Sequence, residues 1–435
     1  MSNDMDTSIN VNHLIDNSKL KPFHYSVFLW CYFIIVVDGY DVMINGVVLP
    51  LLMKEWNLTT SQMGLLTSMT MVGMMFGAMI MGMIADRVGR KISIIICVII
   101  FSGFTCLGGF ADSPIELAIL RFIAGLGIGG VLPNLTALTS EFAPKNVKST
   151  FVTIMLSGSA VGSVLAVLIG QIVIPEHGWR MMFYLAGIPL IFLPFMFKFI
   201  PESLTYLVKN NEMDKARNTI RNIDQNITID DTTTLILTEE KAQKASYKEL
   251  FIKNRALPTV LFGFGMFMAL LMLYALGSWV PKLMINAGYS MSAGLNFLLV
   301  LCIGAVLGNI LGGILADKVG IKPVIVGIFL MGAMTLYLLS FDLSISIIYV
   351  LLGFAGASAS AAGMLLYSYV AQFYPLEVRS TGIGWTSAIG RVGAITGPII
   401  LGVILGMDLS TTMNFIIIAI PALIGAILIA MIKTK

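Results

Sequence analysis

Hydrophobic residues occupy this chain in long continuous runs that short polar segments separate. About 20 apolar residues in a helix cross the hydrocarbon core of a bilayer, so each run is long enough to span one. The pattern predicts an all-α polytopic membrane protein with twelve transmembrane helices. The predicted spans are 25–50, 61–84, 92–111, 115–138, 150–173, 180–200, 258–280, 293–316, 323–341, 345–371, 381–405 and 412–432.

Composition supports a membrane protein and excludes other classes. Of the 435 residues 57% are hydrophobic and only 12% are charged, with a mean hydropathy of +0.89, which is far from the values of soluble domains. The net charge of +3 reflects basic loops and indicates no nucleic-acid partner. The four cysteines fall within apolar runs and lack the spacing of metal ligands, so we expect no disulfide, no metal and no cofactor.

Basic residues predict how the chain is oriented in the membrane. Lysines and arginines gather in the two tails and the even-numbered loops, and only Lys54, Arg180 and Lys282 fall in odd-numbered loops. Cytoplasmic loops carry an excess of Lys and Arg in membrane proteins. We therefore expect both termini to be cytoplasmic.

The two halves of the chain repeat each other at one constant offset. This offset carries Gly82 onto Gly313 and Pro50 onto Pro281 without a gap. Repeat-built bundles of this kind are typical of secondary transporters. We expect two six-helix bundles of parallel topology. The predicted divisions are a cytoplasmic tail at 1–24, an N-terminal bundle at 25–200, a cytoplasmic linker at 201–257, a C-terminal bundle at 258–432 and a second tail at 433–435.

Residues present in both halves are expected to serve packing and gating, whereas unmatched polar residues are expected to serve the substrate. Gly82 and Gly313 would allow close helix packing. Gly89 and Gly320 suit a turn with a positive φ angle. Both pairs lie in the repeated pattern Gly-x-x-x-Asp-(Arg/Lys)-x-Gly that follows spans 2 and 8.

Charged residues of the same loops complete the predicted gate. Asp86 and Asp317 are placed to accept hydrogen bonds from the N-terminal amides of a neighbouring helix. For Glu141, at the end of span 4, a salt bridge to Arg87 or Arg90 is one role and proton transfer is the other. The full gating set is Gly82, Asp86, Arg87, Gly89, Arg90, Glu141, Gly313, Asp317, Lys318 and Gly320.

Two aspartates lie in the middle of the first span. Asp38 and Asp41 share a helix face because they are three residues apart. They fall opposite Ala269 and Met272 in the repeat, so the second half has no equivalent acids. An intramembrane acid costs about 2.5–3.5 kcal/mol, and two on one face cannot both ionise cheaply. The pair predicts a proton or cation site; a structural pair held by neighbouring helices is the alternative.

Two arginines within spans are also unmatched. Arg391 lies in span 11, where its planar guanidinium would suit a carboxylate, although a permanent ion pair with Asp38 or Asp41 is an alternative. Arg121 lies near the outer start of span 4 and could either bind an anion or extend outward to the interface.

Aromatic and amide side chains on the same spans could hold a planar ring, and ordinary packing is the alternative for each. The candidates are Tyr40, Asn45, Asn134, Tyr274 and Trp385.

The spans, the repeat and the paired loop motifs together resemble the major facilitator superfamily over the whole chain. Within it, four segments are similar to those of the aromatic acid:proton symporters. They are Asp38-Gly39-Tyr40-Asp41, Arg121-Phe-x-x-Gly125-x-Gly127-x-Gly129-Gly-x-x-Pro133-Asn134, Ser140-Glu141 and Gly390-Arg391-x-Gly393-x-x-Gly397-Pro398.

Those bacterial inner-membrane carriers import benzoate, hydroxybenzoates and related carboxylates with protons. The resemblance implies that Asp38 and Asp41 serve proton coupling and that Arg121 and Arg391 contribute to anion recognition or to its electrostatics. We expect a carboxylate and protons as partners, the lipid bilayer as the surroundings, and a monomer as the functional unit.

Other functions stay open at this point. The segment Pro201-Glu202-Ser203-Leu204 is also similar to sugar porters, and the wider family includes carriers of aliphatic acids. A drug efflux antiporter would use the aspartates to bind a cation. The sequence offers no nucleophile–base pair, so we expect a transporter and not an enzyme.

Overall fold

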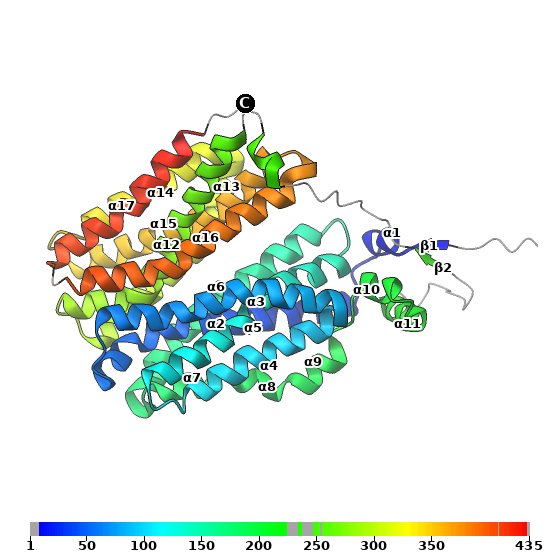
Figure 1. Cartoon of the computed structure of the whole chain (residues 1–435), viewed down its shortest axis with the longest axis horizontal. Coiled ribbons are helices and arrows are strands. Elements are labelled where there is room, and N and C mark those ends of the chain that lie inside the picture. Colours follow the sequence, from blue (N-terminus) through cyan, green and yellow to red (C-terminus); the bar gives the residue numbers. More distant parts are fainter. Residues whose placement is uncertain (1–7, 224–233, 237–246, 253–254, 408, 433–435) are drawn as a thin grey trace, which may run out of the picture.

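The structure is a computed structural model that describes the chain except residues 1–7, 224–233, 237–246, 253–254, 408 and 433–435. Twelve of its helical segments are long and apolar enough to cross a membrane, which confirms the predicted fold class. Figure 1 shows them as two stacked bundles, one formed by the first half of the chain and one by the second.

Long apolar runs fold as helices in a bilayer because only a helix satisfies its own backbone groups there. The N-terminal bundle, or N half, comprises α2 (Pro22–Glu55), α3 (Thr60–Val88), α4 (Arg90–Gly108), α5 (Pro114–Phe142), α6 (Lys148–His177), α7 (Arg180–Leu185), α8 (Ile188–Ile191) and α9 (Leu193–Phe199). The C-terminal bundle, or C half, comprises α12 (Ala256–Asn286), α13 (Met291–Val319), α14 (Ile321–Leu338), α15 (Ile345–Phe373), α16 (Leu376–Leu405) and α17 (Thr411–Ala430).

Local sequence sets where these helices begin, end and break. The hydroxyls of Ser113 and Ser290 accept from the third residue of α5 and α13, which satisfies a free amide at each start. The sixth span is divided into α7, α8 and α9 around Gly187, Pro189 and Pro194. Proline cannot donate the helical hydrogen bond, which explains the interruptions.

The repeat is visible in the turns between helices. Gly89 separates α3 from α4 with φ of 94°, and Gly320 separates α13 from α14 with φ of 101°. Residues with side chains rarely adopt such angles, so the predicted need for glycine at both turns is confirmed.

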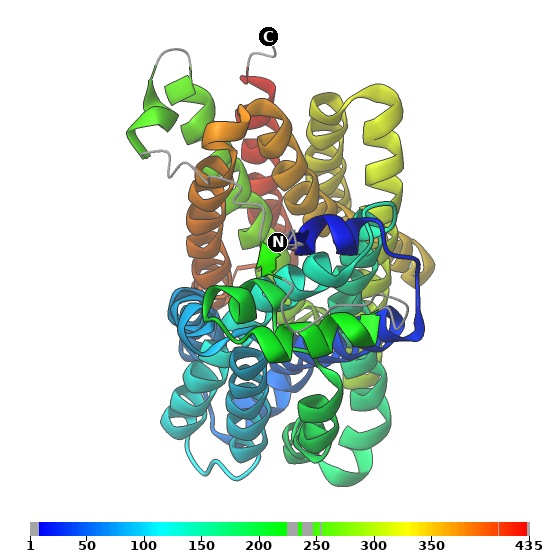
Figure 2. The same ribbon diagram turned by 90° about the vertical axis from the view of Figure 1, so that its right-hand side faces the viewer.

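Segments outside the bundles gather at one end of the molecule, here called the linker end. They are α1 (Val11–Asp16), α10 (Leu204–Lys209), α11 (Met213–Ile223), the 3₁₀ helix η1 (Tyr247–Phe251), and the strands β1 (Ser8–Asn10) and β2 (Thr234–Ile236), which pair in parallel. With the linker end facing the viewer, Figure 2 shows α10 and α11 crossing the end of the N half. Val11 and Ile15 of α1 are buried in the same cluster as Ile220 and Leu235, so this short helix packs on protein.

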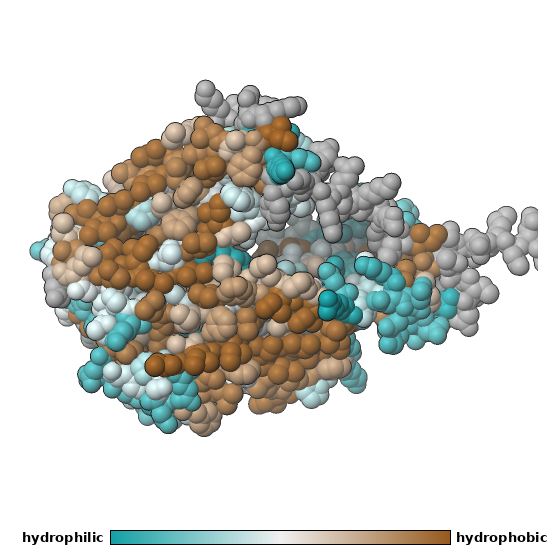
Figure 3. Space-filling model, in the orientation of Figure 1, coloured by the Kyte–Doolittle hydropathy of each residue, from teal (hydrophilic) through white to brown (hydrophobic). Residues whose placement is uncertain are grey.

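The two halves meet toward the opposite end, here called the far end. Ser68 of α3 donates to the carbonyl of Ile395 in α16 over 2.7 Å, and Gln171 of α6 donates to Asn296 of α13 over 2.9 Å. Toward the linker end the halves diverge, and the space-filling view shows a hollow between them (Figure 3). The structure is therefore closed at the far end and open at the linker end.

Candidate functional site

An ion pair lies inside the N half. Nη1 of Arg121, on α5, donates to Oδ1 of Asp41, on α2, over 2.5 Å, and neither side chain is exposed to solvent. Nη2 of the same guanidinium donates to the backbone carbonyl of Asp41 over 3.0 Å. A buried charge needs such compensation, because an isolated one would cost several kcal/mol.

Hydroxyl and amide groups of three helices complete this network. Thr105 of α4 donates to Oδ2 of Asp41 over 2.6 Å and accepts from Nη1 of Arg121 over 2.9 Å. Thr70 of α3 accepts from Nε of Arg121 over 3.2 Å and from the Asn45 amide over 3.1 Å. All five residues are buried, and together they hold α2, α3, α4 and α5 to one another.

Arg121 and Asn45 both make their contacts inside the N half in this structure. Arg121 neither extends to the interface nor presents its guanidinium to a substrate, because each of its three nitrogens has a partner in the N half. The Asn45 amide is directed at Thr70 within the bundle. Groups of α4 and α5 hold the Asp41 carboxylate in this way.

Asp38 differs from Asp41 in its surroundings. Only 5% of its surface is exposed, and its Oδ1 atom has no hydrogen-bond partner in the described part of the chain. Asp41 lies close enough to act electrostatically on it. The helix carrying both acids is fixed against α6 at Gly39, where any side chain would overlap the backbone of Ser159.

Arg391 lies on α16, where the two halves meet. Its Nη1 donates to the carbonyl of Met74 on α3 over 3.1 Å, and its side chain is only partly buried. Within the ranges that the structure describes, no carboxylate forms an ion pair with it, so the expected alternative of a permanent pair with Asp38 or Asp41 is wrong for this conformation.

Tyr274 links this arginine to the unpaired acid. Its hydroxyl, on α12, lies within electrostatic range of Arg391, Asp38 and Tyr367. The Tyr367 hydroxyl in turn donates to Ser387 over 3.2 Å. Asp38 and Arg391 thus both lie within electrostatic range of Tyr274, and these three residues, on α2, α12 and α16, are here called the central cluster.

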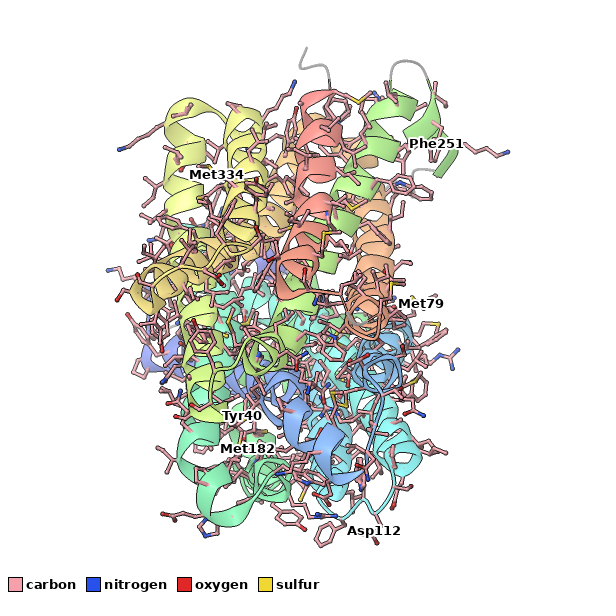
Figure 4. The ribbon with its side chains drawn as sticks, turned by 90° about the vertical axis from the view of Figure 1, so that its left-hand side faces the viewer. Tyr40, Met79, Asp112, Met182, Phe251 and Met334 are labelled. Carbon is pink, nitrogen blue, oxygen red and sulfur yellow. The ribbon has the colours of Figure 1, made fainter. Side chains whose placement is uncertain are left out.

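Three other candidates lie away from that cluster. The Tyr40 hydroxyl donates to the carbonyl of Met182 on α7 over 3.0 Å, and both residues lie together in Figure 4. The Asn134 amide donates to Ser93 and to its own helix. The Trp385 ring packs edge-on against Phe251 of η1 at 5.3 Å. Tyr40 and Asn134 thus make their hydrogen bonds within the N half, and Trp385 packs on η1 while its indole nitrogen has no hydrogen-bond partner in the described chain.

Some of the predicted gating residues form contacts in this structure, and others do not. Arg90 pairs with Glu141 over 2.9 Å, which confirms the expected salt bridge, and Glu141 also accepts from Ser203 and from the amide and hydroxyl of Thr205. The carbonyl of Arg87 accepts from Tyr206. These contacts join the end of α3, the start of α4 and the end of α5 to the start of the linker.

The expected close packing at Gly82 and Gly313 is absent from the part of the chain that the structure describes, since a Cβ atom at either position would meet none of its atoms within 4 Å. Asp86 and Asp317 are exposed and accept no hydrogen bond from the described chain. The neighbouring helices have diverged at the linker end, which leaves these residues without the helix terminus they were expected to contact. The side chain of Lys318 is exposed there as well.

Several participants were not predicted from the sequence. Thr70 and Thr105 complete the ion-pair network, and the Met74 carbonyl receives Arg391. Threonines are common in membrane helices, so nothing marked these two in advance. What distinguishes them is that Asp41 and Arg121 lie next to them, and the sequence alone does not show that these residues are neighbours.

Comparison with known proteins agrees with this architecture. The model of the Major Facilitator Superfamily matches residues 31–307 and 297–435. Among solved structures, a bacterial homologue of the human lysosomal transporter Spinster, in an inward-facing and occupied conformation, has a TM-score of 0.74 at 17% identity and covers 95% of this chain and 97% of its own. The xylose transporter XylE from Escherichia coli, in a partially occluded inward-open conformation, has a TM-score of 0.72 at 17% identity, covering 94% and 97%.

Curated relatives match over nearly the full length. A benzoate transport protein of Acinetobacter baylyi is 45% identical, covering 99% of this chain and 94% of its own length. A gentisate transporter of Corynebacterium glutamicum is 35% identical over 91% and 84%, and a 4-hydroxybenzoate transporter of Acinetobacter baylyi is 32% identical over 97% and 94%. The chain therefore belongs to the major facilitator superfamily, within its family of aromatic acid transporters, and is a transporter and not an enzyme.

Proposed function

We propose that this protein is a symporter that imports a small aromatic carboxylate of the benzoate type together with protons. Two findings support the proposal. The relatives are named for benzoate, gentisate and 4-hydroxybenzoate, which are all aromatic carboxylates. Asp38 and Arg391 both lie within electrostatic range of Tyr274, and neither forms an ion pair within the described chain.

The proposed mechanism rests mainly on the ion pair between Asp41 and Arg121. Their charges cancel inside the N half, so Asp38 and Arg391 are the charges left to act in the central cluster. We assign anion binding to Arg391, because a guanidinium with free donors binds a carboxylate through two parallel hydrogen bonds. Tyr274 would lie beside the bound ring.

Asp38 is assigned the transported proton. Its buried Oδ1 has no donor in the described part of the chain, and leaving a charged oxygen without a donor is costly in such a place. When Asp38 is protonated, the positive charge of Arg391 is free to attract the substrate. When Asp38 is ionised, its charge competes with the substrate for Arg391. Proton and anion would thus bind together and leave together.

Transport would proceed by alternating access around this cluster. The observed state is open at the linker end, which we assign to the cytoplasm of a bacterial inner membrane from the distribution of basic residues, with both termini on that side. In the opposite state, Gly82 and Gly313 would pack closely and Asp86 and Asp317 would contact helix termini. The contacts of Arg87, Arg90 and Glu141 would hold the N half rigid through this movement.

Uptake of labelled benzoate into proteoliposomes tests the coupling. An inward proton gradient should accelerate uptake by the unaltered protein and by Asp342→Asn, which changes an exposed loop acid. Asp38→Asn should remove the response to the gradient while retaining benzoate binding. Uptake by Asp38→Asn that still follows the gradient would refute the role of this acid.

Binding by the arginine is tested separately. Arg391→Gln should weaken benzoate binding about 10- to 100-fold, since charged hydrogen bonds contribute about 1.5–3 kcal/mol and 1.4 kcal/mol is a factor of ten. A thermal-shift titration with benzoate, an aliphatic acid and a sugar measures this and the substrate class. Unchanged benzoate affinity in the variant, or preferential binding of an organic cation, would overturn the assignment.

A further inference from the structure

A cavity of about 580 Å³ lies at the linker end of the N half, apart from the central cluster. Its walls come from the start of α2, the start of α4, the end of α9 and the linker helix α11. Figure 2 shows α11 lying across this end of the bundle. The cavity therefore opens where transmembrane helices give way to the polar linker.

Three lysines line the cavity. Nζ of Lys91 lies 5.5 Å from the centre of the Phe197 ring, and Nζ of Lys198 lies 5.6 Å from that of Phe199. Neither lysine forms an ion pair with any carboxylate in the described ranges, whereas the third, Lys215, pairs with Glu212 over 2.7 Å. Two ammonium groups are thus available to an anion.

The one acid in the cavity wall does not neutralise both lysines. Oε1 of Glu202 accepts from the backbone amides of Lys91 over 3.1 Å and of Ser203 over 2.8 Å. Its charge is directed at the free amides at the start of α4, where an anion is favoured. The cavity keeps a net positive charge from Lys91 and Lys198.

The depth of these lysines matches the headgroup layer of a bilayer. Lys91 is the second residue of α4, and Lys198 is the second-to-last residue of α9. Phe195 and Phe199, which are one turn apart on α9, are 52% and 43% exposed and give an apolar surface leading away from the charged site. The combination suits a molecule with an anionic head and hydrocarbon chains.

We propose that this cavity binds the phosphate headgroup of an anionic phospholipid. The phosphate would contact the ammonium groups of Lys91 and Lys198, and the acyl chains would lie along the phenylalanines of α9. Basic pockets between transmembrane helices bind lipid headgroups in this way. Because the cavity also includes α11, the lipid would connect the linker helix to the N half.

Thermal unfolding of the full chain in detergent tests the site. Added phosphatidylglycerol should raise the unfolding midpoint, whereas phosphatidylcholine and inorganic phosphate should not. The double variant Lys91→Gln/Lys198→Gln should require at least tenfold more phosphatidylglycerol for half of the effect. The single variant Lys198→Gln, which changes an exposed residue, should show a smaller shift in the same direction.

Lys209→Gln is the matched control, because this exposed lysine on α10 does not line the cavity. It should respond to phosphatidylglycerol as the unaltered protein does. The proposal is wrong if the variants of Lys91 and Lys198 respond like the control, or if Lys209→Gln loses the response equally. Stabilisation by inorganic phosphate as strong as that by phosphatidylglycerol would assign the cavity to a soluble anion and overturn the lipid assignment.

Discussion

At the scale of single residues, Asp38 and Asp41 lie three positions apart on one helix but have different surroundings. Arg121 and Thr105 compensate the charge of Asp41, whereas Asp38 has one carboxyl oxygen without a partner among the described residues. Removing one member of a buried pair is more damaging than removing both, because the remaining charge is left uncompensated. Comparing variants that remove one charge of the Asp41–Arg121 pair with a variant that removes both therefore tests whether Asp41 is the structural acid.

Arg121→Gln should lower the free energy of unfolding by about 3–5 kcal/mol, because it leaves the Asp41 carboxylate buried alone. The double variant Asp41→Asn/Arg121→Gln should recover part of this loss. Arg180→Gln is the control, since its ion pair with Glu55 is partly exposed and such pairs contribute about 0–1 kcal/mol. Chemical unfolding in detergent measures all three, and equal losses for the first and third variants would contradict the interpretation.

Glu202 introduces a dependence of stability on pH. Burial raises its pKa above the ordinary value of 4.5, although backbone amides and Lys91 partly oppose that shift. The folded state therefore binds more protons than the unfolded state between 4.5 and the raised pKa. Stability contributed by the protonated form is lost as pH rises through this window.

Unfolding midpoints measured from pH 4.5 to 7 should show this effect. The unaltered protein should lose stability relative to Glu202→Gln as the pH rises, because glutamine does not titrate and can still accept from the α4 amides. Glu176→Gln, which changes an exposed residue, serves as the comparison. Parallel curves for the unaltered protein and Glu202→Gln would show that this carboxyl does not control the pH dependence.

At the scale of helices, glycines determine how closely the halves approach at the far end. A side chain at Gly46 on α2 would overlap the carbonyl oxygen of Gly277 on α12, and one at Gly64 on α3 would come within 2.7 Å of the carbonyl oxygen of Pro398 on α16. Both contacts cross from one half to the other. The closed far end therefore depends on backbone packing against backbone.

Gly46→Ala should disfavour the closed far end, because an added Cβ would increase the distance between α2 and α12 by about 1–2 Å. Spin labels on the exposed far-end residues Asp112 and Asp342 would report a shift toward longer distances. Gly103→Ala is the control, since a Cβ there meets nothing within 4 Å. The same distance distribution in both variants would show that this contact does not limit closure.

At the scale of the whole molecule, the repeat in the sequence predicted most of the architecture. Twelve apolar runs became twelve spanning helices, and the glycines of the repeated loops adopt the expected turns. These features depend on local composition and on distances along the chain, which a sequence contains directly. The break of the sixth span into α7, α8 and α9 is also local, since it follows from Gly187, Pro189 and Pro194.

The partners of the buried charges could not be predicted in the same way. Arg121 and Asp41 are 80 positions apart, and their meeting depends on how α2 and α5 are rotated about their axes. Tyr40 lies between the two aspartates in sequence yet turns toward Met182. Contacts of Asp86 and Gly82 depend further on which end of the transporter is open, a property of the conformation and not of the sequence.

The Asp41–Arg121 pair also sets conditions for how the protein is made. Asp41 enters the membrane with α2, well before α5 and Arg121 have been synthesised. Each charge alone costs about 2.5–3.5 kcal/mol on insertion scales, so each of these two helices gains from the arrival of the other. The C half has Met272 and Leu352 at the equivalent positions and carries no such requirement. During biosynthesis the Asp41–Arg121 pair can therefore form only after the first four spanning helices, α2 to α5, have entered the membrane.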